Sequence, residues 1–201
     1  MKKILFAAER LLIALLFLFT FVACDDDDVP PEENEEEAIT NVILTFSPQG
    51  GGSDVTATWV DADGEGAGDP VLTDIELAVN TTYTLSMVLT NALDPTDPED
   101  ITEEIEEEDD EHMFFFGWTD GLFSDPAGDG NVDTRSDAVN YEDPLDENGY
   151  PVGLETEWTT GDAATGEFRV VLKHQPDIKS ATSGATDGES DIDIRWDIEI
   201  Q

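Results

Sequence analysis

The chain has 201 residues, of which 49 are acidic and 8 are basic, and its formal net charge at pH 7 is -41. A field of this sign repels nucleic acid and anionic lipid headgroups, so we expect neither as a partner. The acidic excess favours solubility in a saline habitat, and a dedicated cation-binding role is the alternative.

The first 23 residues have the parts of an export signal. Lys2, Lys3 and Arg10 supply a positive start, an apolar run follows from Leu11 to Val22, and the small Ala23 ends the segment. The uninterrupted run is shorter than the about 20 apolar residues that a membrane-spanning helix needs. We therefore expect residues 1–23 to be a cleaved signal peptide.

Cys24, the only cysteine, comes directly after the expected cleavage point. With Phe21, Val22 and Ala23 it resembles a bacterial lipoprotein signal, which implies that the cysteine is lipidated and becomes the first residue. The resemblance supplies three acyl chains, and stable attachment needs more than one. An ordinary secreted protein is the alternative, but its unpaired thiol would be a liability in an oxidising compartment. We expect a membrane anchor at Cys24.

Residues 24–37 form an acidic tract with one large apolar side chain, Val29, so they cannot bury enough surface to fold. Like charges extend such a tract into a tether. Its first acids resemble the export tag that sends some lipoproteins of the Bacteroidota to the outer face of the outer membrane: Asp25, Asp26, Asp27 and Asp28. The resemblance implies an outer-membrane lipoprotein exposed at the surface, and a periplasm-facing domain is the alternative.

Residues 38–201 have the length and apolar content of one compact domain. Alternating apolar side chains predict its strands, most clearly where Ile192, Ile194, Trp196, Ile198 and Ile200 alternate with charged residues. Strands are expected over 39–47, 54–60, 71–79, 82–91, 112–119, 153–160, 167–174 and 191–200, with a weaker one over 138–141.

This pattern predicts an all-β fold, a single antiparallel β-sandwich of about eight strands, immunoglobulin-like or related. Pro98 to Asp110 is the one segment with helical spacing, because Ile101 and Ile105 are four apart and Asp97-Pro98 could cap a short helix. We expect at most one or two turns there, since the acids that follow oppose the helix dipole.

One loop resembles a calcium-binding loop. It places oxygen ligands at positions one, three, five and nine, with glycine at six: Asp61, Asp63, Glu65, Asp69 and Gly66. Position twelve is Leu72, where the helix-loop-helix family has a bidentate glutamate, and the flanking segments are expected to be strands. We expect either a calcium-stabilised hairpin or an exposed turn rich in aspartate and glycine.

Two other loops are weaker candidates. Asp129, Asn131 and Asp133 form a poorer version of the calcium pattern, because Thr134 stands where glycine is needed. Residues 143–149 end in Asn148-Gly149, which is a strong turn signal.

The chain has only two histidines, His112 and His174, each at the end of an expected strand. If they met near Glu108 or Glu111, zinc or copper could be bound, because imidazole and carboxylate suit both ions. Axial ligation of haem by the pair is a second possibility. The simpler alternative is two histidines packed at the sheet ends and hydrogen-bonded to neighbouring acids.

The densest aromatic cluster comprises Met113 to Phe116 together with Trp118. A strand alternates its faces, so Met113 and Phe115 should oppose Phe114 and Phe116, and we expect core on both sides. Trp59 and Trp158 are expected in the core too, although an exposed tryptophan near the acidic loops would suit carbohydrate.

No phosphate-binding glycine loop, GxSxG or HExxH string occurs. Carboxylates are too abundant for any pair to indicate acid and base catalysis. We therefore expect a binding module and not an enzyme.

The strings DITEEIEEEDDEHMFFF, YPVGLE and RVVLKHQP resemble those of small acidic lipoproteins from marine Bacteroidota, usually labelled "type 1 periplasmic binding fold superfamily protein". The label implies a solute-binding component with two α/β lobes, and it brings no established ligand or catalytic residue. The residue pattern itself predicts an anchored envelope module that binds an envelope protein, a glycan or a small ligand. Metal or haem capture by the two histidines is the alternative.

Overall fold

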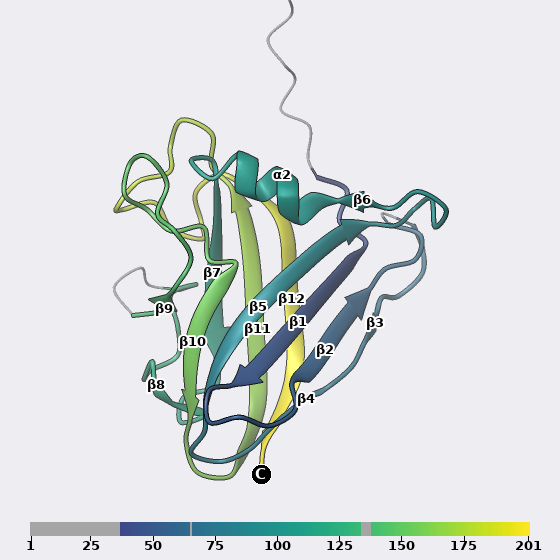
Figure 1. Cartoon of the computed structure of the whole chain (residues 1–201). Helices are drawn as coiled ribbons and strands as arrows, with labels where there is room; N and C mark the ends of the chain where they lie inside the picture. The colour runs from purple at the N-terminus through teal and green to yellow at the C-terminus, as the bar shows by residue number, and fades with distance from the viewer. Residues whose placement is uncertain (1–36, 65, 134–137) are drawn as a thin grey trace, which may run out of the picture. The chain divides into compact units, whose positions relative to one another are not determined.

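The computed structural model describes residues 37–64, 66–133 and 138–201, and they form two packed β-sheets with one helix (Figure 1). The elements in chain order are β1 (Asn41–Pro48), β2 (Val55–Val60), β3 (Val71–Leu72), β4 (Ile75–Leu77), β5 (Thr82–Asn91), β6 (Glu99–Asp100), α2 (Ile101–Glu107), β7 (His112–Trp118), β8 (Phe123–Asp125), β9 (Asn140–Tyr141), β10 (Glu155–Thr160), β11 (Ala164–His174) and β12 (Glu189–Ile200).

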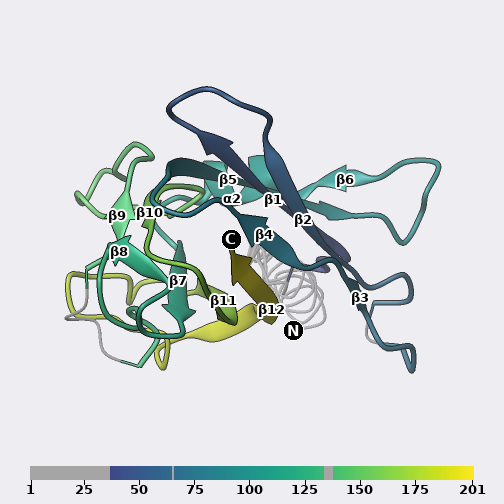
Figure 2. The same ribbon diagram turned by 90° about the horizontal axis from the view of Figure 1, so that it is seen from below.

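The larger sheet has the order β3-β2-β1-β5-β10-β8, with β6 beside β5 and β9 beside β10. The smaller sheet has the order β4-β12-β11-β7. Seen from below, the two sheets lie one over the other (Figure 2). The predicted all-β sandwich is confirmed, and the two α/β lobes that the family label implies are not present in the described residues.

Alternation along each strand explains the two layers. In β12, buried Ile192, Ile194 and Trp196 alternate with the outward-facing Asp193 and Arg195. In β5, Tyr83, Leu85, Met87 and Leu89 are buried in the same alternating way. The buried faces meet in a core rich in aromatic rings, including Phe46, Phe116, Trp158 and Phe168.

The aromatic strand β7 is buried on both faces, as predicted. Phe114 and Phe116 belong to the core between the sheets. Met113 and Phe115 face the other way and form a second small apolar cluster with Val171. Trp158 is fully buried, whereas Trp59 is only partly buried against the core.

The helix begins later than its sequence signal indicated. Asp100, not Asp97, is the N-cap, and its Oδ1 accepts hydrogen bonds from the backbone amides of Thr102 and Glu103 at 3.1 and 3.4 Å. Ile101 and Ile105 are buried, as their spacing predicted. The last turn has no basic residue.

The expected strand over 71–79 is wrong as a single element. Its first part, β3, pairs with β2 in the larger sheet, whereas β4 pairs with β12 in the smaller sheet and runs parallel to it. Between them, the exposed Thr73 is bonded to β2, because its Oγ1 accepts a 2.8 Å hydrogen bond from the amide of Thr58. The segment therefore crosses from one sheet to the other.

Other boundaries differ less. β11 begins at Ala164, three residues before the sequence indicated, and the short β6 and β8 were not predicted. The expected turn over 143–149 is present, because the amide of Asp146 donates to the Tyr150 carbonyl and Gly149 has a φ of 87°. Among the described residues, no helix is long and apolar enough to cross a membrane.

Candidate metal centre

His112 and His174 are directly paired across β7 and β11. His112 opens β7 and His174 ends β11, so the two residues lie at the end of the smaller sheet near α2 (Figure 1). Because they occupy one cross-strand pair, their side chains share a face. The imidazole rings stack with centroids 4.5 Å apart and planes 12° apart. Sequence reasoning placed both histidines at strand ends but left their meeting open.

Three acids surround the ring of His112, which is fully buried. Its Nε2 lies 3.1 Å from Oε1 of Glu37 and 4.0 Å from Oδ2 of Asp191. On the other side of the ring, Nδ1 lies 3.3 Å from the Glu108 carbonyl oxygen and 3.9 Å from Oε2 of Glu108. The side chain of Asp191 is also fully buried, and that of Glu37 is only 7% exposed.

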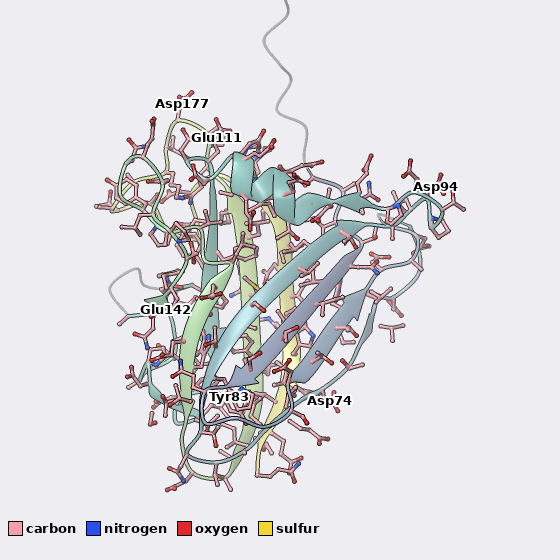
Figure 3. The ribbon with its side chains drawn as sticks, in the orientation of Figure 1. Asp74, Tyr83, Asp94, Glu111, Glu142 and Asp177 are labelled. Atoms are coloured by element: carbon pink, nitrogen blue, oxygen red, sulfur yellow. The ribbon has the colours of Figure 1, made fainter. Side chains whose placement is uncertain are left out.

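His174 is contacted by an acid that lies nearer the surface, Glu111. Its Nε2 lies 3.1 Å from Oε2 of Glu111, whose side chain is 37% exposed beside the end of α2 (Figure 3). Its Nδ1 is buried and has no hydrogen-bond partner among the described residues. Glu108 and Glu111 therefore lie beside the two histidines, as their positions in the sequence suggested.

This cluster contains most of the buried polar atoms that lack hydrogen bonds in the described part of the chain. They are Oε2 of Glu37, Nε2 of His112, Nδ1 of His174 and both carboxylate oxygens of Asp191. Nε2 of His112 is close enough to Glu37 for ion pairing, but it is not aligned as a hydrogen bond. Burying such atoms without partners is costly, so their concentration at one place calls for a physical explanation.

The pKa values of the cluster depend on one another. Burial, reinforced by the charge of Glu37, raises the pKa of Asp191 to about 7. Burial opposes protonation of His112, but the carboxylate of Glu37 outweighs it and raises the pKa of that imidazole. Burial acts in the opposite direction on Glu37, but His112 lowers the pKa of its carboxyl. The site therefore holds protons near neutral pH that a cation could displace.

Two overlapping sets of ligand atoms are close enough together to hold a metal ion. One atom each from Glu37, His112 and His174 lie within 4.8 Å of one another, and so do one atom each from Glu108, Glu111 and His174. The first set is largely buried, and the second combines the exposed Glu108 and the half-buried Glu111 with the buried His174. His174 belongs to both, so it connects the outer acids with the inner ones.

The ring geometry favours a small ion over haem. Two axial ligands must point at the iron from opposite faces of the porphyrin, whereas the imidazoles of His112 and His174 stack face to face. The stacked pair is therefore unsuited to axial ligation of haem.

The candidate calcium loop is arranged as a turn. The carboxylate of Asp63 accepts a 3.1 Å hydrogen bond from the amide of Gly68, and Oδ1 of Asp61 accepts a 3.4 Å bond from the amide of Asp63. Asp61, Asp63 and Asp69 do not form a metal-sized group in the described part of the chain, and Glu65 lies outside it. Calcium binding stays a prediction.

Several sequence predictions fall outside the described residues. These are the signal peptide, Cys24, and the export tag Asp25, Asp26, Asp27 and Asp28, as well as Thr134 in the second loop. In that loop the Asn131 side chain is structural: its Oδ1 accepts from the Phe116 amide and its Nδ2 donates to the Tyr141 hydroxyl, both at 2.8 Å.

Sequence reasoning missed Glu37 and Asp191. Glu37 is the last acid of the tether tract, and Asp191 is the first residue of the last expected strand, directly before Ile192. Nothing in the local pattern distinguishes either one from its acidic neighbours. Their burial becomes visible only in the structure, where both carboxylates pack against His112.

The comparisons with known proteins give no family for this chain: no family model matches it, and neither a curated protein nor a solved structure is significantly similar.

Proposed function

We propose that the chain is a lipid-anchored cell-envelope protein whose β-sandwich binds a divalent transition metal, zinc or copper, through Glu37, His112 and His174. The observation that carries the proposal is the concentration of buried, unpartnered nitrogen and oxygen atoms in this one cluster. A bound cation would satisfy several of them at once, which hydrogen bonds among the neighbouring residues do not.

The ligand types support this choice of ion. Two imidazoles and one carboxylate form a set that zinc uses in open sites, where a fourth position remains for water or another ligand. Imidazole is also a good ligand for copper. Calcium prefers six to eight oxygens, so a site with two nitrogens does not suit it.

The surroundings of the cluster would assist uptake. In the outer group, the acids Glu108 and Glu111 reach the surface, and the buried His174 is shared with the inner group. The charge of the whole chain also raises the local concentration of cations. The anchor at Cys24 and the acidic tether would keep this domain attached to the envelope, at the cell surface or facing the periplasm.

Isothermal titration of the purified full chain with Zn²⁺, in about 0.15 M NaCl and excess Mg²⁺, tests the proposal. The salt and Mg²⁺ suppress diffuse binding to the acidic surface. We expect one tight site that is lost in the double variant His112→Asn, His174→Asn. Titration with Cu²⁺ followed by electron paramagnetic resonance should show coupling to two nitrogens.

A matched control is the double variant Glu103→Gln, Glu107→Gln, which removes two exposed acids of the helix. It should keep the site. Glu111→Gln is a milder test than replacing the buried histidines, and we expect it to weaken binding without unfolding the domain. Equal Zn²⁺ binding by the wild type and the double histidine variant, with both chains folded, would rule the site out.

A further inference from the structure

A second cleft, separate from the histidine cluster, lies between α2, β5 and the segment that leads into β10. It has a volume of about 440 Å³ and is lined by residues of all three parts. This volume is within the range of sites for small organic molecules. Figure 3 shows Glu142 on this flank of the domain.

The inner surface of the cleft is apolar. Met87, Val152 and Leu154 line it, and all three are buried in the core. The floor is held in place by a backbone hydrogen bond of 3.1 Å from the amide of Met87 to the carbonyl of Leu154. The carboxylate of Asp143 also fixes the floor, because it accepts hydrogen bonds from the amides of Val152 and Gly153 at 2.8 and 3.0 Å. The cleft is therefore preformed.

The rim is acidic. Glu106, Glu142 and Glu155 line the opening with exposed side chains, and none of the three carboxylates has an ion pair or hydrogen bond with another described residue. No lysine or arginine lines the cleft. The C-terminal end of α2, which also lacks a basic residue, adds its partial negative charge on the same side.

From this combination we propose that the cleft binds a small organic cation with a hydrocarbon body, in which an aliphatic ammonium group is held by the glutamate rim and the carbon chain lies on the apolar floor. An anionic ligand would be repelled by the rim. A bare inorganic cation would leave the floor uncovered, and a neutral apolar ligand would leave the carboxylates without a counter-charge. An alkylammonium ion satisfies both surfaces, and this site does not depend on the metal centre.

The test uses hexylammonium as the probe, with propylammonium and hexanol as matched comparisons. Titrations of the full chain are followed by methyl resonances of Met87, Val152 and Leu154 in about 0.5 M NaCl, which screens diffuse attraction to the acidic surface. We expect hexylammonium to bind saturably at one site and to shift these resonances. Propylammonium should bind at least about tenfold more weakly, since it buries three fewer methylenes. Hexanol should also bind at least about tenfold more weakly, because it lacks the charge.

The double variant Glu142→Gln, Glu155→Gln should weaken hexylammonium binding by about tenfold, because charged hydrogen bonds are lost. The matched control is Asp97→Asn with Glu99→Gln, two exposed acids outside the cleft, which should leave it unchanged. The proposal is overturned if binding does not saturate, if it is insensitive to chain length, if the shifted methyls lie elsewhere, or if both double variants bind equally well.

Discussion

His112 and His174 form one cross-strand pair at the end of the β7–β11 ladder, and their imidazoles stack with centroids 4.5 Å apart. Two rings so close would repel one another if both were protonated. A carboxylate is placed on each side of the stack, Glu37 against His112 and Glu111 against His174, both at 3.1 Å. The structure thus provides counter-charges for the pair, and the same atoms provide ligands for an ion.

Zinc should stabilise the domain through this pair. At a free concentration about 100 times the Kd, binding to the folded state alone adds about 2.7 kcal/mol to the free energy of unfolding. Thermal unfolding followed by circular dichroism should therefore show a higher Tm with Zn²⁺ than with a chelator. His174→Gln should abolish the increase, and Glu76→Gln, an exposed acid in β4, should retain it. An equal increase in the His174 variant would point to binding elsewhere.

Asp191 should make the metal-free domain less stable as pH rises. Its folded pKa of about 7 lies above the ordinary value of 3.8, so the folded state keeps a proton that the unfolded state has lost. The associated stability is present below pH 3.8, declines above it and is lost as pH passes about 7. Glu37, His112 and Lys173 are the charged groups that act on this carboxyl.

The measurement for Asp191 is urea unfolding in a chelator at pH 5 and pH 8, for the wild type and Asp191→Asn. The asparagine cannot ionise, so we expect it to remove roughly 2–3 kcal/mol of the loss between the two pH values. Asp193→Asn is not a suitable control, because Asp193 pairs with Arg169. Asp197→Asn, which is exposed in the same strand, should keep the wild-type pH dependence. Parallel behaviour of Asp191→Asn and wild type would show that Asp191 ionises normally.

Breaking the buried ion pair of Lys179 with Asp146 should lower the free energy of unfolding strongly. Nζ of Lys179 lies 3.1 Å from Oδ2 of Asp146, and the two side chains are 1% and 0% exposed. Lys179→Met would leave a buried carboxylate without its partner, which typically costs 3–5 kcal/mol. Urea unfolding should show a loss of about this size.

The comparison for that prediction is Arg195→Met. Arg195 lies 3.8 Å from Glu167, and both side chains are more than half exposed. Exposed pairs contribute about 0–1 kcal/mol, so this variant should unfold almost as the wild type does. Similar losses in the two variants would mean that burial does not set the strength of the Lys179 pair.

Gly188 should tolerate no side chain. Its φ is 74°, and a Cβ at this position would overlap the carbonyl oxygen of His174. We expect Gly188→Ala to lower the free energy of unfolding by about 2 kcal/mol or more. It should also weaken Zn²⁺ binding, because the backbone of the proposed ligand His174 must move. Gly184→Ala, in the same loop but with open space around it, should change neither stability nor binding. The two alanine variants are compared by urea unfolding and zinc titration.

Replacing Cys24 with serine should release the chain from membranes, because the proposed lipid anchor needs the thiol of this residue. Fractionation and labelling with a fatty acid check this. Replacing Asp25 to Asp28 with asparagine should leave the chain membrane-bound and change only its accessibility to protease added outside the cell. A membrane-bound Cys24→Ser protein would exclude the lipid anchor as the means of attachment.

Strong local patterns account for what the sequence could predict. The alternation of Ile192 to Ile200 and of Tyr83 to Leu89 depends on neighbouring residues alone, so β12 and β5 were found with nearly correct ends. The crossing at Thr73 and Asp74 could not be found in this way, because it depends on which strand each half pairs with. The same holds for the site: the histidines are visible as rare residues at strand ends, but the burial of Glu37 and Asp191 results from contacts between distant parts of the chain.

The position of β12 has a consequence for how the domain is made. β12 lies inside the smaller sheet, with β4 on one side and β11 on the other, so this layer cannot be completed until residues up to Ile200 have been synthesised and are free to pair. Pairing β12 with β4 also closes a long loop, which is slow. Until then only β7 and β11 can cover the larger sheet, so part of its apolar face stays exposed, and the many like charges of the chain would oppose aggregation during that time.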